Sequence, residues 1–166
     1  MTTQQIFGLQ VLLSFVLYTL VARWYVSPRL GALPVDRALQ PLLVLHATRH
    51  MGLVFLVPTV VGGALPAAFA ASAAYGDLLA GALALGALVA LRARAGVARP
   101  LTWLFNIVGL ADLVNAFYQG LSHDVQLGAA YYIPTFIVPA LVVTHVMIFR
   151  LLLRHSASAA GTLPAA

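Results

Sequence analysis

The residues whose types are best suited to binding or catalysis lie together in the segment His46-Ala47-Thr48-Arg49-His50, in the middle of a long apolar run. A guanidinium at the centre of a bilayer costs several kcal/mol unless a partner, a cavity or a ligand offsets that cost. On an α-helix, His46, Arg49 and His50 occupy positions i, i+3 and i+4 and share one face. The pattern therefore predicts a functional site inside a membrane.

Asp112, on a different apolar segment, is the expected partner of Arg49. At about 1.5 Å of rise per residue, Arg49 lies about 15 Å and Asp112 about 16 Å from the same membrane surface. Two interpretations stay open: a buried ion pair that only fixes helix register, or a cavity in which Arg49 is free to bind an anion or a carboxylate. The neighbouring histidines favour the cavity, because an ion pair that only fixes helix register does not need them.

A polar stripe is predicted to lead from mid-membrane to the outer surface, because four polar residues recur there at helical spacing. These residues are Asp112, Asn115, Gln119 and Ser122. The predicted ligand-binding set is therefore His46, Arg49, His50, Asp112, Asn115, Gln119 and His145.

His46 and His145 offer an alternative chemistry. They are predicted about 10 and 12 Å from the inner surface, on different helices. Two neutral imidazoles at one depth can ligate a b-type haem axially, so a haem- or quinone-binding redox subunit is an alternative function. In the other interpretation each ring hydrogen-bonds a backbone carbonyl or a threonine, and Thr48 and Thr144 are nearby.

The composition excludes several classes of enzyme. The chain has no cysteine, which removes thiol catalysis, disulfides and cysteine-ligated metals. It has no glutamate and therefore no His-Glu-x-x-His zinc motif, and its five histidines are too few for a membrane di-iron site. No serine stands in a nucleophile elbow. Catalysis stays open, but the sequence favours a protein that is not an enzyme.

Composition also favours a membrane protein, with 62% hydrophobic and 8% charged residues among 166 and a mean hydropathy of +0.97. A helix needs about 20 apolar residues to cross a bilayer. The sequence holds five such runs: Ile6–Val26, Leu39–Val61, Ala73–Leu91, Leu101–Leu121 and Ala129–Leu153. We expect an all-α, polytopic transmembrane bundle of five helices, with residues 1–155 as one domain and residues 156–166 as a disordered tail.

The arginines predict the orientation of this bundle. All nine basic residues are arginines, and every one except Arg49 falls at the ends of alternate runs. Basic residues accumulate in cytoplasmic loops, so the N-terminus is expected outside and the C-terminus in the cytoplasm. This arrangement, with the arginines away from any aromatic-rich basic surface, favours a multi-pass membrane protein and argues against nucleic-acid binding. The high content of Ala, Leu, Val, Gly and Arg is typical of a GC-rich bacterial genome, so a bacterial inner membrane is the expected location.

We therefore expect a binding or transport protein whose intramembrane Arg/His/Asp site holds a small anionic, protonatable or amphiphilic ligand. The redox subunit is one alternative, and a non-catalytic accessory subunit of a larger membrane complex is another. The expected partners are the lipid bilayer and a small molecule. The small-residue ridge of Ala82, Gly86 and Ala90 also allows the contacts of a homodimer.

Overall fold

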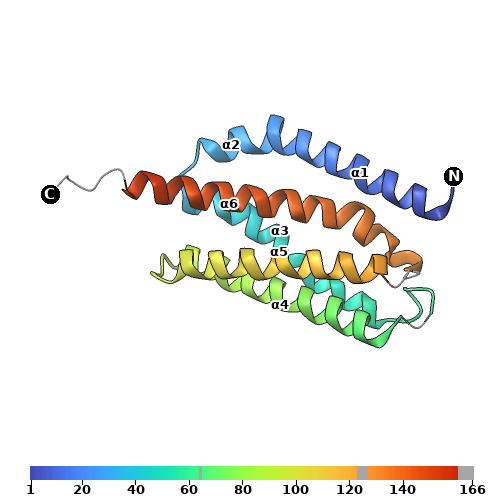
Figure 1. Cartoon of the computed structure of the whole chain (residues 1–166). Helices are drawn as coiled ribbons and strands as arrows, with labels where there is room; N and C mark the ends of the chain where they lie inside the picture. The colour runs from blue at the N-terminus through green and yellow to red at the C-terminus, as the bar shows by residue number, and fades with distance from the viewer. Residues whose placement is uncertain (64, 123–126, 161–166) are drawn as a thin grey trace.

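The computed structural model describes residues 1–63, 65–122 and 127–160 of the chain. It is all-helical, with 87% of the residues in helices and no strand in the described ranges. The elements in chain order are α1 (Thr3–Val21), η1 (Ala22–Val26), α2 (Ser27–Gly31), α3 (Val35–Ala47), η2 (Thr48–Leu56), α4 (Ala67–Arg92), α5 (Ala98–Ser122), η3 (Gly128–Tyr131), η4 (Ile133–Ile137) and α6 (Val138–Ala160). They form one elongated bundle (Figure 1).

Four helical stretches are long and apolar enough to cross a membrane: Thr3–Gly31, Ala67–Arg92, Ala98–Ser122 and Gly128–Arg154. They correspond to the first, third, fourth and fifth apolar runs of the sequence. The last of the helices, α6, continues to Ala160, past the expected start of the tail at Ser156, and residues 161–166 lie outside the described ranges.

The second apolar run differs from the prediction of one continuous α-helix. Helix α3 ends at Ala47, and the chain continues as the 3₁₀-helix η2 until Leu56, followed by turns. At the junction, the Thr48 hydroxyl donates to the Leu45 carbonyl at 2.6 Å. A 3₁₀-helix is narrower than an α-helix and rises about 2.0 Å per residue, so it extends the chain further for the same number of residues.

Helix α4 is the element against which η2 packs, and its buried face consists mainly of small residues. A Cβ atom at Gly81 would lie 3.3 Å from the His50 amide nitrogen and 3.4 Å from the Ala47 carbonyl oxygen, so the two backbones are in direct contact. The small-residue ridge singled out in the sequence lies elsewhere on this helix: Ala82 is exposed, and Gly86 and Ala90 are half-buried. A homodimer through that ridge stays a prediction.

Helix α1 is peripheral. It has no buried residue and packs against α6 and η4. Figure 1 shows it along the outside of the bundle, separated from α4 by the other helices. Its N-terminal half contacts α5 and η3 through Phe7, whose ring centroid lies 6.2 Å from that of Phe117 and 5.8 Å from that of Tyr131.

The core is divided into two apolar clusters. One includes Leu39, Leu43, Phe105 and Ile148, and lies toward the end where α2 and the last turns of α6 are found. The other includes Phe55, Val61, Phe69, Ala73 and Ala130, at the end of the bundle that holds the N-terminus. Between the two clusters lie the buried charged residues that form the candidate site.

Candidate functional site: a buried arginine between two carboxylates

Arg49 is the centre of the site and is 3% exposed. Its Nε donates to Asp77 Oδ1 at 2.7 Å, and its Nη2 donates to Asp112 Oδ2 at 2.6 Å. Its Nη1 donates to the Gly109 carbonyl at 2.9 Å. One guanidinium therefore joins η2, α4 and α5, and each of its three nitrogens has an acceptor.

The pairing of Arg49 with Asp112 is confirmed, but the sequence analysis missed the second carboxylate. Asp77 is only 9% exposed and lies well inside α4. The apolar run predicted from the sequence begins at Ala73, which places Asp77 near the start of the helix, where a carboxylate is favoured by the helix dipole alone. The helix in fact begins at Ala67, directly after Pro66. That proline was the signal that could have located the helix start correctly.

One buried histidine, His145, approaches Arg49 at Nη1, the nitrogen that does not donate to either carboxylate. His145 Nε2 is 3.5 Å from Arg49 Nη1, and His145 Nδ1 donates to Asn106 Oδ1 at 2.7 Å. The Asn106 amide donates back to the His145 carbonyl at 3.2 Å. Because Nδ1 carries the proton in this arrangement, Nε2 presents its lone pair to the guanidinium.

His46 is fully buried and packs against His145, with 4.1 Å between the ring centroids and an angle of 48° between the ring planes. Its Nε2 lies 3.0 Å from the Thr144 hydroxyl, which itself donates to backbone carbonyls of α6. Its Nδ1 has no hydrogen-bond partner among the described residues. The threonine interpretation of the sequence is therefore confirmed for this histidine.

A bis-histidine haem does not fit this geometry. Axial ligation needs the iron and its planar macrocycle between the two imidazoles. Here the rings are in contact, and the Phe105 ring packs against both, with its centroid 5.1 Å from that of His46 and 5.3 Å from that of His145. Among the described residues, no group of three or more potential ligands is placed to hold a metal ion.

His50 does not join the site, contrary to the prediction from helical spacing. It is exposed, and its Nδ1 lies 3.1 Å from the Ala47 carbonyl. The physical reason is the change of helix type after Ala47. In a 3₁₀-helix, residues i and i+3 eclipse one another, whereas residue i+4 points about a third of a turn away. Arg49 thus stays in line with His46, and His50 turns outward.

Asn115 and Gln119 form a separate polar contact between α5 and α4. The Asn115 amide donates to the Ser72 hydroxyl at 3.1 Å, and the Gln119 amide donates to the same hydroxyl at 3.3 Å. Ser122 is exposed and donates to the Tyr118 carbonyl at 2.8 Å. The predicted stripe therefore runs along the junction of two helices, and only its first member, Asp112, contacts Arg49.

Three glycines allow the charged groups to approach one another. A Cβ atom at Gly52 would overlap the Asp77 carboxylate, and one at Gly76 would overlap the Asp112 carboxylate. A Cβ atom at Gly109 would lie 2.9 Å from His145 Cε1 and 3.0 Å from Arg49 Nη1. The site thus depends on these glycines as much as on its charged residues. Their spacing follows no helical periodicity, so the sequence did not reveal this requirement.

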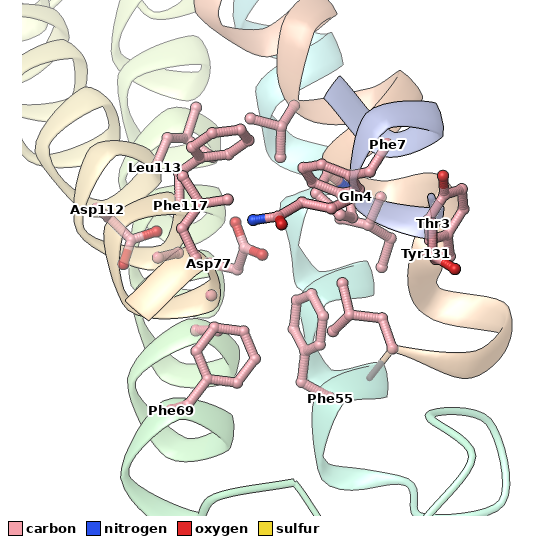
Figure 2. Close-up of a pocket in the computed structure, with 18 of the residues that line it drawn as sticks. Thr3, Gln4, Phe7, Phe55, Phe69, Asp77, Asp112, Leu113, Phe117 and Tyr131 are labelled. Atoms are coloured by element: carbon pink, nitrogen blue, oxygen red, sulfur yellow. The ribbon is translucent and has the colours of Figure 1, made fainter. Parts of the chain in front are cut away.

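A cavity of about 500 Å³ lies beside the carboxylates, toward the end of the bundle that holds the N-terminus. Figure 2 shows its aromatic walls and, at one end, the Asp77 carboxylate with Asp112 next to it. The Gln4 side chain extends from α1 across the cavity toward Asp77. The aromatic residues that line the cavity are Phe7, Phe55, Phe69, Phe117 and Tyr131.

The chain belongs to a family described as a domain of unknown function (DUF8737), which matches residues 6–153. The comparisons with curated proteins and with solved structures found no match. Family membership therefore carries no activity over to this chain, and the functional argument rests on the geometry of the site.

Replacing Gly76 by alanine is expected to destabilise the protein, because the new methyl group would displace the Asp112 carboxylate from Arg49. Breaking a buried ion pair costs about 3 kcal/mol or more. The matched control is Gly86→Ala in the same helix, where the new Cβ would meet Leu101 Cδ2 at an ordinary 3.6 Å. Alanine is the better helix former by up to about 1 kcal/mol, so this control should be neutral or stabilising. Equal thermal midpoints for the two variants in detergent would contradict the packing described here.

The two carboxylates are expected to be non-additive in stability. Asp77→Asn or Asp112→Asn alone leaves Arg49 with one carboxylate and an amide oxygen, so each should cost only about 1 kcal/mol. The double variant leaves a buried guanidinium without any anion and should cost more than the sum of the single variants, by about 3 kcal/mol. The measurement is a double-mutant cycle on the free energy of unfolding in mixed micelles. Additive losses would mean that the two aspartates do not share Arg49.

Proposed function

We propose that the chain is a five-helix integral membrane protein of a bacterial inner membrane, with its N-terminus outside. The four apolar stretches support this proposal. The fifth crossing would be α3 with η2, whose combined length is about 37 Å because η2 rises about 2.0 Å per residue. The distribution of arginines supports the orientation, since those outside the site belong to the segments at one end of the bundle.

We propose further that the cavity binds a small amphiphile with a positively charged head, an organic ammonium ion with an apolar body. The single observation that carries this proposal is the pair of carboxylates, Asp77 and Asp112, at the wall of a cavity lined otherwise by aromatic, aliphatic and uncharged polar side chains. One guanidinium faces two carboxylates, so the fully ionised cluster has a net charge of −1 and attracts cations.

The geometry argues against an anionic ligand, the first of the chemistries that the sequence allowed. The Arg49 side chain is 1% exposed, and its three nitrogens already donate to Asp77, Asp112 and the Gly109 carbonyl. An anion would have to displace one of these acceptors and approach the other carboxylate at close range. An ammonium ion needs no such rearrangement.

The aromatic walls suit the same class of ligand. A cation over the face of an aromatic ring is stabilised by the ring quadrupole, and aromatic cages are the common way in which proteins bind quaternary ammonium groups. Phe55 and Phe69 pack edge to face, with 5.9 Å between their centroids, and Figure 2 shows both rings beside the Asp77 carboxylate. The remaining apolar surface would hold the body of the ligand.

Benzyltrimethylammonium is a suitable probe, and its uncharged isostere neopentylbenzene is the matched control ligand. Titration calorimetry of the purified full-length protein in detergent should show saturable binding of the cation and at least about tenfold weaker binding of the isostere. Asp77→Asn should weaken cation binding by about tenfold or more, because it removes the charge that faces the cavity.

The control variant is Asp36→Asn. Asp36 is also a carboxylate paired with an arginine, at 3.1 Å from Arg99 Nε, but it does not line the cavity. Its replacement should leave the affinity for benzyltrimethylammonium unchanged. Equal affinities for the cation and for neopentylbenzene would show that the cavity selects shape rather than charge, and would refute the assigned ligand class.

A further inference from the structure

The charged groups around the cavity do not balance. The groups that face Arg49 come from every element packed around it: Asp77 of α4, Asp112 of α5, and His145 of α6, with His46 of α3 behind His145. Helix α1 contributes only uncharged side chains to the cavity, and the Tyr131 hydroxyl of η3 donates to Gln10. With both aspartates ionised, this assembly holds one positive and two negative charges.

Neither histidine supplies the missing positive charge. Protonation of His145 at Nε2 would place an imidazolium 3.5 Å from Arg49 Nη1, against a like charge. His46 is fully buried and packs against His145, with 4.1 Å between the ring centroids, so a proton there would add a second cation to the same buried region. The histidines are therefore best accommodated as neutral hydrogen-bonding groups, and the balance is left to the carboxylates.

Each carboxylate has one oxygen available for a proton. Arg49 engages Asp77 through Oδ1 and Asp112 through Oδ2. Asp77 Oδ2 and Asp112 Oδ1 have no hydrogen-bond partner in the part of the chain that the structure describes. A net negative charge within an apolar region is costly, and the usual response of a protein is to neutralise it by binding a proton.

We propose that, in the absence of ligand, one proton is shared by the Asp77–Asp112 pair and that binding of an organic ammonium ion releases it. This inference rests on the proposed function, because it needs the ammonium ligand as the replacing cation. The exchange is balanced. The singly protonated pair takes up one ammonium ion, becomes fully ionised beside it, and releases one proton to the solvent. The ammonium ion and the proton then compete for the same pair, so each lowers the affinity of the pair for the other, as thermodynamic linkage requires.

Benzyltrimethylammonium tests the exchange cleanly, because a quaternary ion has no proton of its own to lose. Calorimetric titrations of the full-length protein at one pH, in phosphate and in Tris, should give heats that differ by the buffers' ionisation enthalpies for close to one proton per bound ligand. Below the pH at which the pair ionises, affinity should rise with pH, by up to about tenfold per pH unit, the slope for one released proton.

Asp112→Asn is the diagnostic variant. It leaves Arg49 and Asp77 as a neutral pair with no shared proton, so ligand binding should become weaker, independent of pH, and equal in heat in the two buffers. Asp36→Asn should keep the proton release of the unmodified protein, because Asp36 and Arg99 form a separate pair outside the cavity.

The outcomes separate the two proposals. Binding of the cation with equal heats in both buffers and no pH dependence would overturn the exchange and leave the proposed ligand class standing. Proton release that persists in Asp112→Asn would also overturn it, because the proton would then come from another group. Absence of any binding of benzyltrimethylammonium at every pH tested between about 5 and 8 would overturn both proposals.

Discussion

The structure depends on one buried guanidinium shared by two carboxylates. Arg49 links η2, α4 and α5 through hydrogen bonds of 2.6 to 2.9 Å, and it approaches α6 through His145. The apolar contacts among these helices are non-directional and consist largely of small residues, so they tolerate sliding of one helix along another. The ion pairs do not, because a displaced partner leaves a charge without compensation in an apolar region. Arg49 therefore sets the relative positions of three elements at once.

The same constraint explains the unusual path of the second apolar run. If α3 continued as an α-helix, a wider helix would face α4 at the position where Asp77 pairs with Arg49. The 3₁₀-helix η2 is narrower and lies close enough to α4 for the pair to form. Two glycines allow this approach: Gly52 lies against Asp77, and Gly81 of α4 lies against the backbone at His50. Long 3₁₀-helices are uncommon because their hydrogen-bond geometry is poorer than that of an α-helix. The long 3₁₀-helix of this chain contains Arg49, and the Arg49–Asp77 ion pair ties it to α4.

The sequence was sufficient to predict the helical class, the approximate positions of the helices and the partnership of Arg49 with Asp112, because apolar run length and depth along a helix are simple geometric quantities. It was insufficient for His50 and Asp77. The position of His50 depended on a change of helix type that no residue pattern announced, and the role of Asp77 depended on a helix start that we placed six residues late, at Ala73 instead of Ala67. Asn106, which hydrogen-bonds His145, was missed because an uncharged amide, unlike Arg49 or Asp112, carries no charge that requires a partner.

The charge of the site follows from where its groups point rather than from which residues it contains. Arginine and histidines in an apolar segment suggest a site for anions, which is one of the ligand classes that the sequence leaves open. In the folded chain the cation is enclosed, with a side chain 1% exposed, while the carboxylates are 13% and 12% exposed and line the cavity. The positive charge thus serves to hold two acidic groups close together, a position they would otherwise resist through mutual repulsion. The negative side of the cluster is the one that faces the cavity, where aromatic rings lie beside it.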